Sequence, residues 1–142
     1  MDFNIRPALQ LTQALLPATR AAHFGRIINI TSLVTRGLAF RFSYAAAKAA
    51  LESMTRTMAI ELAANRITAN AVAPGPTESE LFRANNPRGT EEEVRYLRRV
   101  PMERFAQPAE IVGTVAFLAS NAAAYSTGQT FLVDGGASLG TL

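Results

Sequence analysis

Three short apolar, β-branched runs, separated by helix-forming segments, set the tightest limit on how this chain can fold. The runs are "RIINI" from Arg26, "RITANAVAP" from Arg66 and "GQTFLVDGG" from Gly128. Runs of this kind are typical of strands buried in a parallel sheet. Strands that alternate with helices connect through right-handed crossovers. The order therefore predicts an α/β fold, with a small parallel sheet flanked by helices.

Three segments are predicted to be helical. The alanine-rich segment from Ser43 to about Ala64 is one, because alanine has the highest intrinsic helix propensity. In "QPAEIVGTVAFLAS", Pro108 suits the first helical position and Glu110 the first turn. Asn4 is a plausible N-cap for the first segment, with a proline close behind it in the first turn. The apolar side chains of that first segment follow helical spacing: Ile5, Leu9, Leu11, Leu15 and Leu16.

Residues 77–107 form a polar, charged excursion between the second and third strands, with "NNPRGTEEE" at its centre. We predict one or two short helices here. A long segment without a clear core pattern is often a lid or a binding loop. The sheet has only three strands, and no strand-to-helix turn of the G-x-G-x-x-G kind appears in the sequence.

Composition excludes several classes of function. The 142 residues predict a single domain, residues 1–142, with an ordinary globular content of 49% hydrophobic and 18% charged residues. The net charge is +3, and the basic side chains are scattered without interleaved aromatic residues, so nucleic-acid binding is not expected. The absence of cysteine excludes disulfides and thiolate metal sites. The lone histidine, His23, is interpreted as a turn residue, and no metal site is expected.

The sequence contains neither a signal-peptide pattern nor an apolar run long enough to span a membrane. A cytoplasmic protein without a membrane partner is the expectation.

The stretch "SYAAAKAAL" contains the only lysine among fourteen basic residues. Tyr44 and Lys48 are four apart in a predicted helix, so their side chains share one face. A close ammonium favours the phenolate form of a phenol, which makes a tyrosine useful for moving protons. Arginine has a broad fork suited to carboxylates, whereas the compact lysine ammonium can face a phenol and a sugar diol together. The Tyr-x-x-x-Lys spacing also arises by chance, so this pair alone does not establish a site.

Two further segments end at the same edge of the predicted sheet. Ser32 follows the strand "RIINI", and the Pro74-Gly75 turn ends the next strand. Ligand crevices open at the carboxyl ends of parallel strands, so these residues and Tyr44 are expected to meet at one crevice.

The segments "GRIINITS", "YAAAK", "ITANAVAPG" and "TGQTFLVDGG" together resemble the successive signatures of the short-chain dehydrogenase/reductase family. The chain is most similar to the branch that includes 3-oxoacyl-[acyl-carrier-protein] reductases, and the resemblance covers essentially all 142 residues. It implies the C-terminal half of a doubly wound, Rossmann-type fold, with the N-terminal nucleotide-binding half and its glycine-rich turn absent.

The resemblance implies four catalytic residues. Tyr44 is matched to the general acid/base, and Lys48 to the lysine that binds the nicotinamide ribose and favours the phenolate. Ser32 is matched to the serine that polarises the substrate carbonyl. Asn4 is matched to the asparagine that holds a water in a proton relay, a role that a helix cap could replace or accompany.

The same resemblance implies cofactor contacts. Besides Tyr44 and Lys48, the Pro74-Gly75 turn is matched to the segment that contacts the nicotinamide. Thr77 is matched to the residue that meets the carboxamide, and Ser79 to one that touches the nicotinamide or a phosphate. A second proline at position 76 departs from the family pattern, and a plain loop is the alternative for both residues.

Two functions from different classes follow from this resemblance. The first is an NAD(P)(H)-dependent oxidoreductase that interconverts a carbonyl and an alcohol on a small molecule, with the choice between NAD and NADP open. In this reading a preceding N-terminal segment is missing, and the chain is expected to form a homo-oligomer through the helices after Asn4 and Ser43. The second is a truncated, non-catalytic remnant that acts as a dimerisation or interaction module. Ser32, Tyr44 and Lys48 favour the first, because an interaction module does not need all three.

Overall fold

The three predicted strands form one parallel sheet in the order β1–β2–β3, in a computed structural model that describes residues 2–140. β1 spans Gly25–Ile30, β2 spans Ile67–Pro74 and β3 spans Thr130–Val133. β2 lies in the centre and is paired along its length, first with β1 and then with β3. The predicted α/β class with a partial Rossmann-type parallel sheet is confirmed.

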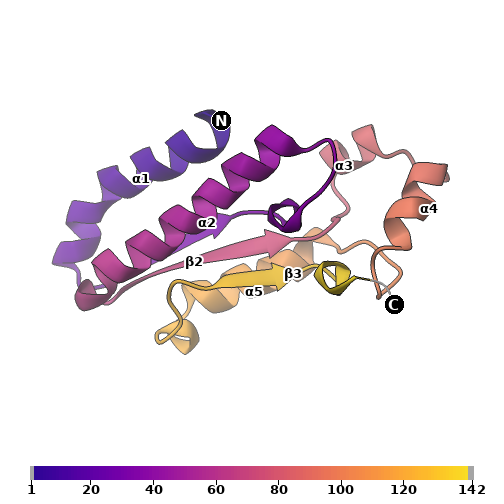
Figure 1. Cartoon of the computed structure of the whole chain (residues 1–142). Helices are drawn as coiled ribbons and strands as arrows, with labels where there is room; N and C mark the ends of the chain where they lie inside the picture. The colour runs from indigo at the N-terminus through magenta and orange to yellow at the C-terminus, as the bar shows by residue number, and fades with distance from the viewer. Residues whose placement is uncertain (1, 141–142) are drawn as a thin grey trace.

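Helices cover both faces of this sheet (Figure 1). α1 (Asp2–Ala21) and α2 (Phe42–Leu62) lie on one face, and α5 (Pro108–Ala119) lies on the other. The short helices α3 (Glu80–Asn85) and α4 (Glu91–Leu97) lie beyond the carboxyl ends of the strands. Four short 3-10 turns complete the elements: η1 (Leu33–Arg36), η2 (Ala63–Asn65), η3 (Asn121–Ala123) and η4 (Ala137–Leu139).

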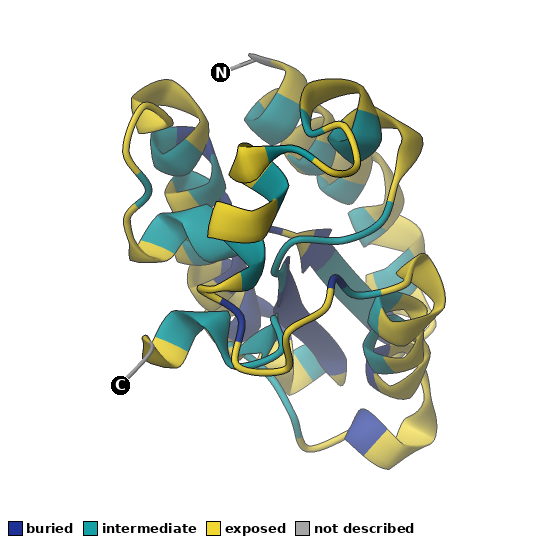
Figure 2. Cartoon of the chain, turned by 90° about the vertical axis from the view of Figure 1, so that its right-hand side faces the viewer, coloured by how far each residue is buried: buried dark blue, intermediate teal, exposed yellow. Residues whose placement is uncertain are grey.

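The core is organised around β2, whose buried residues form the dark centre of Figure 2. On one side, Ile67 and Ala69 pack with Met58, Ala59 and Leu62 of α2. On the other side, Val72 packs with Leu118 of α5 and with Ala123 of η3. Because both faces of β2 are covered, its residues from Ile67 to Ala73 are all buried, including the polar Thr68 and Asn70, instead of alternating between buried and exposed.

Polar side chains in this core are satisfied. Asn29 of β1 donates to the Thr55 hydroxyl at 2.8 Å. Asn70 of β2 donates to the Ser126 carbonyl at 2.7 Å and accepts from the Gln129 amide at 3.1 Å. In the part of the chain that the structure describes, no buried side-chain nitrogen or oxygen lacks a partner. Each bond avoids the desolvation penalty of an unpaired buried group, and together they tie α2 and the segment before β3 to the sheet.

Most of the predicted helices are present, with shifted ends. The alanine-rich helix begins at Phe42 and ends at Leu62. Pro108 is the first residue of α5, and Glu110 accepts from the Gln107 amide at 2.7 Å. The excursion after β2 contains two short helices, as expected.

The prediction that Asn4 caps the first helix is wrong. α1 begins at Asp2, so Asn4 lies inside the first turn, and Pro7 lies inside the helix rather than in its first turn. Asparagine has a moderate helix propensity, so its own chemistry does not prevent a helix that begins two residues earlier.

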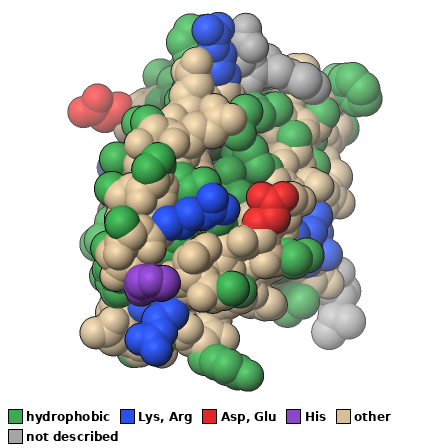
Figure 3. Space-filling model, turned by 90° about the vertical axis from the view of Figure 1, so that its left-hand side faces the viewer, with side chains coloured by type: hydrophobic (Ala, Val, Ile, Leu, Met, Phe, Trp, Pro, Cys, Tyr) green, Lys and Arg blue, Asp and Glu red, His purple; other side chains and the backbone are tan. Residues whose placement is uncertain are grey.

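The opposite end of the molecule, at the amino ends of the strands, contains the single histidine (Figure 3). His23 is exposed in the turn after α1 and has a positive φ of 47°. This confirms its interpretation as a turn residue. Within residues 2–140, no helix is both long enough and apolar enough to cross a membrane.

Gly75 is expected to tolerate no side chain. A Cβ built at this position would lie 2.7 Å from the backbone Cα of Asp134, whereas a Cβ at Gly113 in α5 would meet nothing within 4 Å. Gly75→Ala should therefore lower the free energy of unfolding by about 1–3 kcal/mol, the usual range for overpacking. Gly113→Ala is the matched control and should raise it by about 1 kcal/mol, because alanine replaces glycine inside a helix. Urea unfolding measures both, and similar effects of the two variants would contradict the close approach at Gly75.

Acid should remove the contribution of one surface ion pair. Arg104 donates to both oxygens of Glu110 at 2.7 and 2.6 Å, and these bonds together with the Gln107 amide lower the pKa of Glu110 to about 2. Because the folded pKa lies below the unfolded value of about 4.3, the stabilisation is complete above the unfolded pKa. It is lost as the pH falls toward 2.

Arg104→Gln tests this pair. The difference in unfolding free energy between the parent chain and Arg104→Gln should be constant above about pH 5 and shrink steadily below about pH 4.3. The Glu110 carboxyl, followed by NMR, should titrate at higher pH in the variant. A stability difference that grows on acidification would show that another group controls it.

Candidate active site

The carboxyl ends of the strands, where the site is predicted, face the viewer in Figure 2. β1 ends at Ile30 and β2 ends at Pro74. Ser32 follows the first strand by two residues, and Gly75 directly follows the second. The chain then leaves the sheet at both points, because η1 follows β1 and the α3–α4 excursion follows β2.

Lys48 connects α2 to this edge. Its Nζ donates to the Ile30 carbonyl at 2.8 Å, and the same Nζ lies 5.7 Å from the centroid of the Tyr44 ring. The helix places the two side chains one turn apart on one face, as their spacing predicts. Partial burial lowers the pKa of Lys48, since it removes solvation from the ammonium. An ammonium and a phenol therefore lie together at the end of β1.

Tyr44 lies on an open surface. It is 39% exposed, in the first turn of α2. Two hollows of about 370 and 300 Å³ lie in the described part of the molecule, and neither is lined by Ser32, Tyr44 or Lys48. The pair is accessible from solvent, and a second surface is needed to exclude water from it.

Ser32 holds the start of η1. Its hydroxyl accepts from the Val34 amide at 3.4 Å, and its residue is half-buried. This bond uses the oxygen as an acceptor, so the hydroxyl proton stays available to an incoming acceptor such as a carbonyl oxygen.

The turn after β2 is closed by backbone bonds. The Gly75 amide donates to the Val133 carbonyl at 2.9 Å, which draws the ends of β2 and β3 together. The Thr77 hydroxyl donates back to the Gly75 carbonyl at 3.0 Å, and the Glu78 amide donates to the Ala106 carbonyl at 2.8 Å. The structure therefore gives the Pro74-Gly75 turn and Thr77 a fixed backbone, with Thr77 half-buried.

Ser79 has a local partner that competes with its predicted role. The Ser79 hydroxyl accepts from the Phe82 amide at 3.1 Å and caps α3, so this residue is a helix cap rather than a plain loop residue. Asn4 is half-buried in the first turn of α1. The structure brings Ser32, Tyr44, Lys48 and the Pro74-Gly75 turn to one edge of the sheet, and it makes Ser79 the N-cap of α3.

Two features of this edge were missed by reasoning from the sequence. Asp134 accepts from the amides of Gly136 and Ser138 at 3.0 and 2.8 Å and so shapes the turn after β3. The signal for it is the Asp-Gly-Gly sequence, which is typical of such turns. The second is a cluster around Arg83 in the excursion, where the sequence shows only scattered charges.

Comparisons with known proteins agree with this arrangement. Residues 1–138 match the family model described as enoyl-(acyl carrier protein) reductase. The chain is 42% identical over 137 residues to a 3-oxoacyl-[acyl-carrier-protein] reductase of Vibrio cholerae, covering 96% of this chain and 55% of that protein. It is 43% identical over 137 residues to the reductase of the same name from Pseudomonas aeruginosa, covering 96% and 54%. The chain thus spans about half the length of the curated relatives it matches.

Solved structures show the same likeness. A gluconate 5-dehydrogenase of Burkholderia cenocepacia in complex with NADP and tartrate superposes with a TM-score of 0.88 at 35% identity, over 97% of this chain and 54% of that one. A 3-oxoacyl-[acyl-carrier protein] reductase of Brucella melitensis superposes with a TM-score of 0.87 at 31% identity, over 94% and 49%. A protein described as a short chain dehydrogenase/reductase family protein is 38% identical over 96% of this chain. With its parallel sheet, its Tyr44–Lys48 pair and these matches, the chain belongs to the short-chain dehydrogenase/reductase family and is similar to the C-terminal portion of its 3-oxoacyl-[acyl-carrier-protein] reductases.

Proposed function

We propose that this chain provides the catalytic and nicotinamide-side residues of an NAD(P)(H)-dependent oxidoreductase that interconverts a carbonyl and an alcohol. The observation that carries the proposal is the Lys48 ammonium bonded to the Ile30 carbonyl with the Tyr44 ring 5.7 Å away. The family match supports it, as does the likeness to a dehydrogenase in complex with NADP.

The residues at the carboxyl edge fit a nicotinamide ribose. An ammonium has three N–H donors, and Lys48 uses one of them on the Ile30 carbonyl, which leaves two for a diol. Pro74 and Gly75 would contact the nicotinamide ring, and Thr77 would meet the carboxamide through its backbone. Ser79 would reach the nicotinamide or a phosphate only by sharing or giving up its cap on α3. When bound, the nicotinamide supplies a hydride to a carbonyl carbon or takes one up from an alcohol.

Tyr44 is the proposed general acid/base. In the reducing direction, the Ser32 hydroxyl donates to the substrate oxygen and polarises the carbonyl. The phenolic O–H of Tyr44 gives its proton to that oxygen, and the nearby Lys48 ammonium stabilises the phenolate that remains. Asn4 would hold a water that returns a proton to the site. In the oxidising direction the phenolate takes the proton back from the alcohol.

An interaction module is the second candidate function, and exposed apolar side chains favour it. On α1, Phe3, Leu11 and Leu15 are 97%, 62% and 60% exposed. On α2, the small residues Ala46 and Ala49 lie outside the core, which uses Ala47 and other positions of the helix. These faces suit a homo-oligomer through α1 and α2, and such an assembly is compatible with either function.

Cofactor binding and turnover distinguish the two functions. NADH and NADPH binding to the purified chain is measured by calorimetry, and again with any in-frame segment encoded upstream of Met1. Binding of NADH or NADPH, to the chain alone or to the chain with that upstream segment, supports the oxidoreductase function. Tyr44→Phe should then reduce kcat by about 10²–10⁴-fold, the usual contribution of a general acid/base, while the cofactor Kd stays nearly constant.

Tyr125→Phe is the control, because Tyr125 is fully exposed beyond η3. It should leave kcat unchanged. If neither the chain alone nor the chain with the upstream segment binds NADH or NADPH, the oxidoreductase proposal is overturned. The interaction module is then the remaining candidate function. Full activity of Tyr44→Phe would instead contradict the proton-transfer role alone.

Lys48→Arg should impair both cofactor binding and kcat. The guanidinium keeps the charge but cannot place a compact ammonium between the Ile30 carbonyl and a diol. A lost hydrogen bond to a charged group costs about 1.5–3 kcal/mol, which corresponds to a rise of roughly 10–150-fold in the cofactor Kd. Arg56→Lys, an exposed exchange two turns further along α2, is the control and should change neither quantity. An unchanged cofactor Kd in Lys48→Arg would contradict the proposed contact between Lys48 and the nicotinamide ribose.

A further inference from the structure

One guanidinium holds together the excursion that follows β2. Arg83 of α3 binds Glu78 through two bonds, one of them from Nε to Oε2 at 2.6 Å, and its Nη1 lies 2.5 Å from Oε1 of Glu93 in α4. The side chains of Arg83, Glu78 and Glu93 are 19%, 19% and 14% exposed. The cluster therefore links the turn after β2, α3 and α4 at a largely enclosed point.

Aromatic rings form the base of this cluster. Phe82 packs edge-to-face against Tyr96 at 5.9 Å and against Phe105 at 5.0 Å between ring centroids. The guanidinium carbon of Arg83 lies 5.1 Å from the Phe105 centroid and 5.8 Å from that of Phe82. Rings at these distances attract the cation and shield its ion pairs from water.

The same carboxylate orders the loop between the two helices. The second oxygen of Glu93 accepts from the Gly89 amide at 2.6 Å, and the Thr90 hydroxyl caps α4. Bonds from Arg83 lower the pKa of both Glu78 and Glu93, so both carboxylates are charged at neutral pH. Without the guanidinium, two enclosed negative charges would repel each other across the excursion.

The cluster is connected directly to the Pro74-Gly75 turn. Glu78 donates its amide to the Ala106 carbonyl at 2.8 Å, and the Ala106 amide donates to the Pro76 carbonyl at 3.0 Å. The two ends of the excursion thus meet beside the turn that is proposed to contact the nicotinamide. A change in the order of the excursion would alter the surface next to that turn without touching Tyr44 or Lys48.

We propose that Arg83 is a positioning residue that keeps residues 78–98 ordered as a preformed lid beside the site, so that it controls substrate binding rather than the chemical step. This rests on the proposed function, because the excursion borders the turn of the site proposed above. Tyr44 lies on an open surface, so a lid could exclude water from it. A purely stabilising ion pair is the competing explanation, and it would affect the whole fold.

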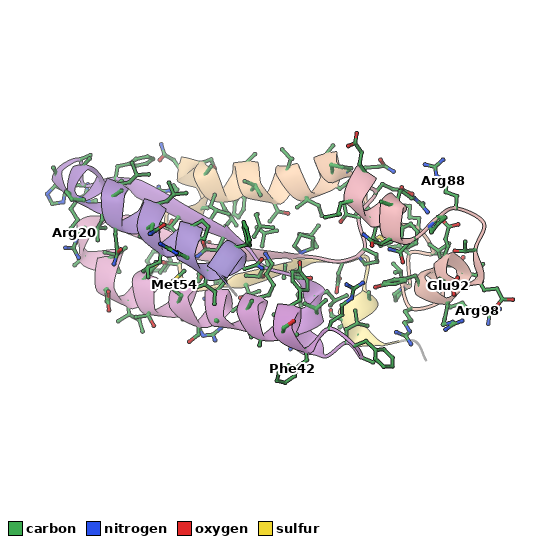
Figure 4. The ribbon with its side chains drawn as sticks, turned by 90° about the horizontal axis from the view of Figure 1, so that it is seen from above. Arg20, Phe42, Met54, Arg88, Glu92 and Arg98 are labelled. Atoms are coloured by element: carbon green, nitrogen blue, oxygen red, sulfur yellow. The ribbon has the colours of Figure 1, made fainter. Side chains whose placement is uncertain are left out.

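Hydrogen exchange followed by mass spectrometry tests the ordering directly and needs no activity. In Arg83→Gln, amides within residues 78–98 should exchange at least about tenfold faster, since local opening has its own free energy. Peptides from β2 and α2 should keep the exchange rates of the parent chain. Arg88→Gln is the matched control: Arg88 is 78% exposed, lies 3.9 Å from Glu78 and extends from the outer surface of the excursion (Figure 4).

Two further variants keep the test decisive if Arg83→Gln does not fold. Arg83→Lys keeps the charge but cannot bind two carboxylates in the same geometry, so its exchange should be intermediate. The triple variant Glu78→Gln, Glu93→Gln, Arg83→Gln removes the repulsion and should exchange more slowly than Arg83→Gln alone. Equal acceleration in β2 and in residues 78–98, or none in either, would overturn the proposal.

Kinetics separate this proposal from the proposed function. Where the parent chain turns over a carbonyl substrate, Arg83→Gln should raise the KM for that substrate at least about tenfold, with kcat and the cofactor Kd within about threefold. Arg83→Lys should recover part of the loss, and Arg88→Gln should match the parent. A fall in kcat at constant KM would overturn the lid role. A parent chain without turnover would count against the proposed function, while the exchange data would still decide whether Arg83 orders the excursion.

Discussion

Burial of β2 on both faces is the constraint on which the rest of this structure depends. Ala69, Ala71, Val72 and Ala73 have no exposed surface, because α2 covers one side of the strand and α5 the other. Small side chains let both helices approach closely, at interior packing density. The strand also contains Asn70, and a buried amide is tolerated only because the segment before β3 satisfies it. The strand order, the helix layers and the path into β3 all follow from completing this core.

The position of α2 against β2 then determines the site. Tyr44 lies two turns before Leu51 and four turns before Met58, both of which are buried, so it lies on the same helical face as they do. Lys48, one turn after Tyr44, is held on that face beside the end of β1. Lys48 reaches the Ile30 carbonyl at the end of β1. The result is an ammonium fixed by the fold rather than by another charge. This arrangement supports the proposed proton-transfer role of Tyr44, which the mutants above are designed to test.

The excursion after β2 is a second, smaller packing unit built on different physics. Its centre is Arg83, which lies between two carboxylates and against the rings of Phe82 and Phe105, whereas the main core is mostly apolar. Such a unit depends on matched charges, and the loss of Arg83 would leave two enclosed carboxylates without their shared partner. It is joined to the sheet through Ala106 and the turn after β2. The proposed lid role requires that the order of the excursion can change while the sheet stays intact.

The sequence alone determined the three strands, the long alanine-rich helix and the start of α5 at Pro108, because strand burial, helix propensity and proline geometry act over a few neighbouring residues. It also placed Tyr44 and Lys48 on one helical face. Only the tertiary structure decided that Lys48 bonds to Ile30, that α1 begins before Asn4 and that Arg83 joins two glutamates. Those contacts join different structural elements or compete with local preferences of about 1 kcal/mol, and only the completed packing determines which of them form.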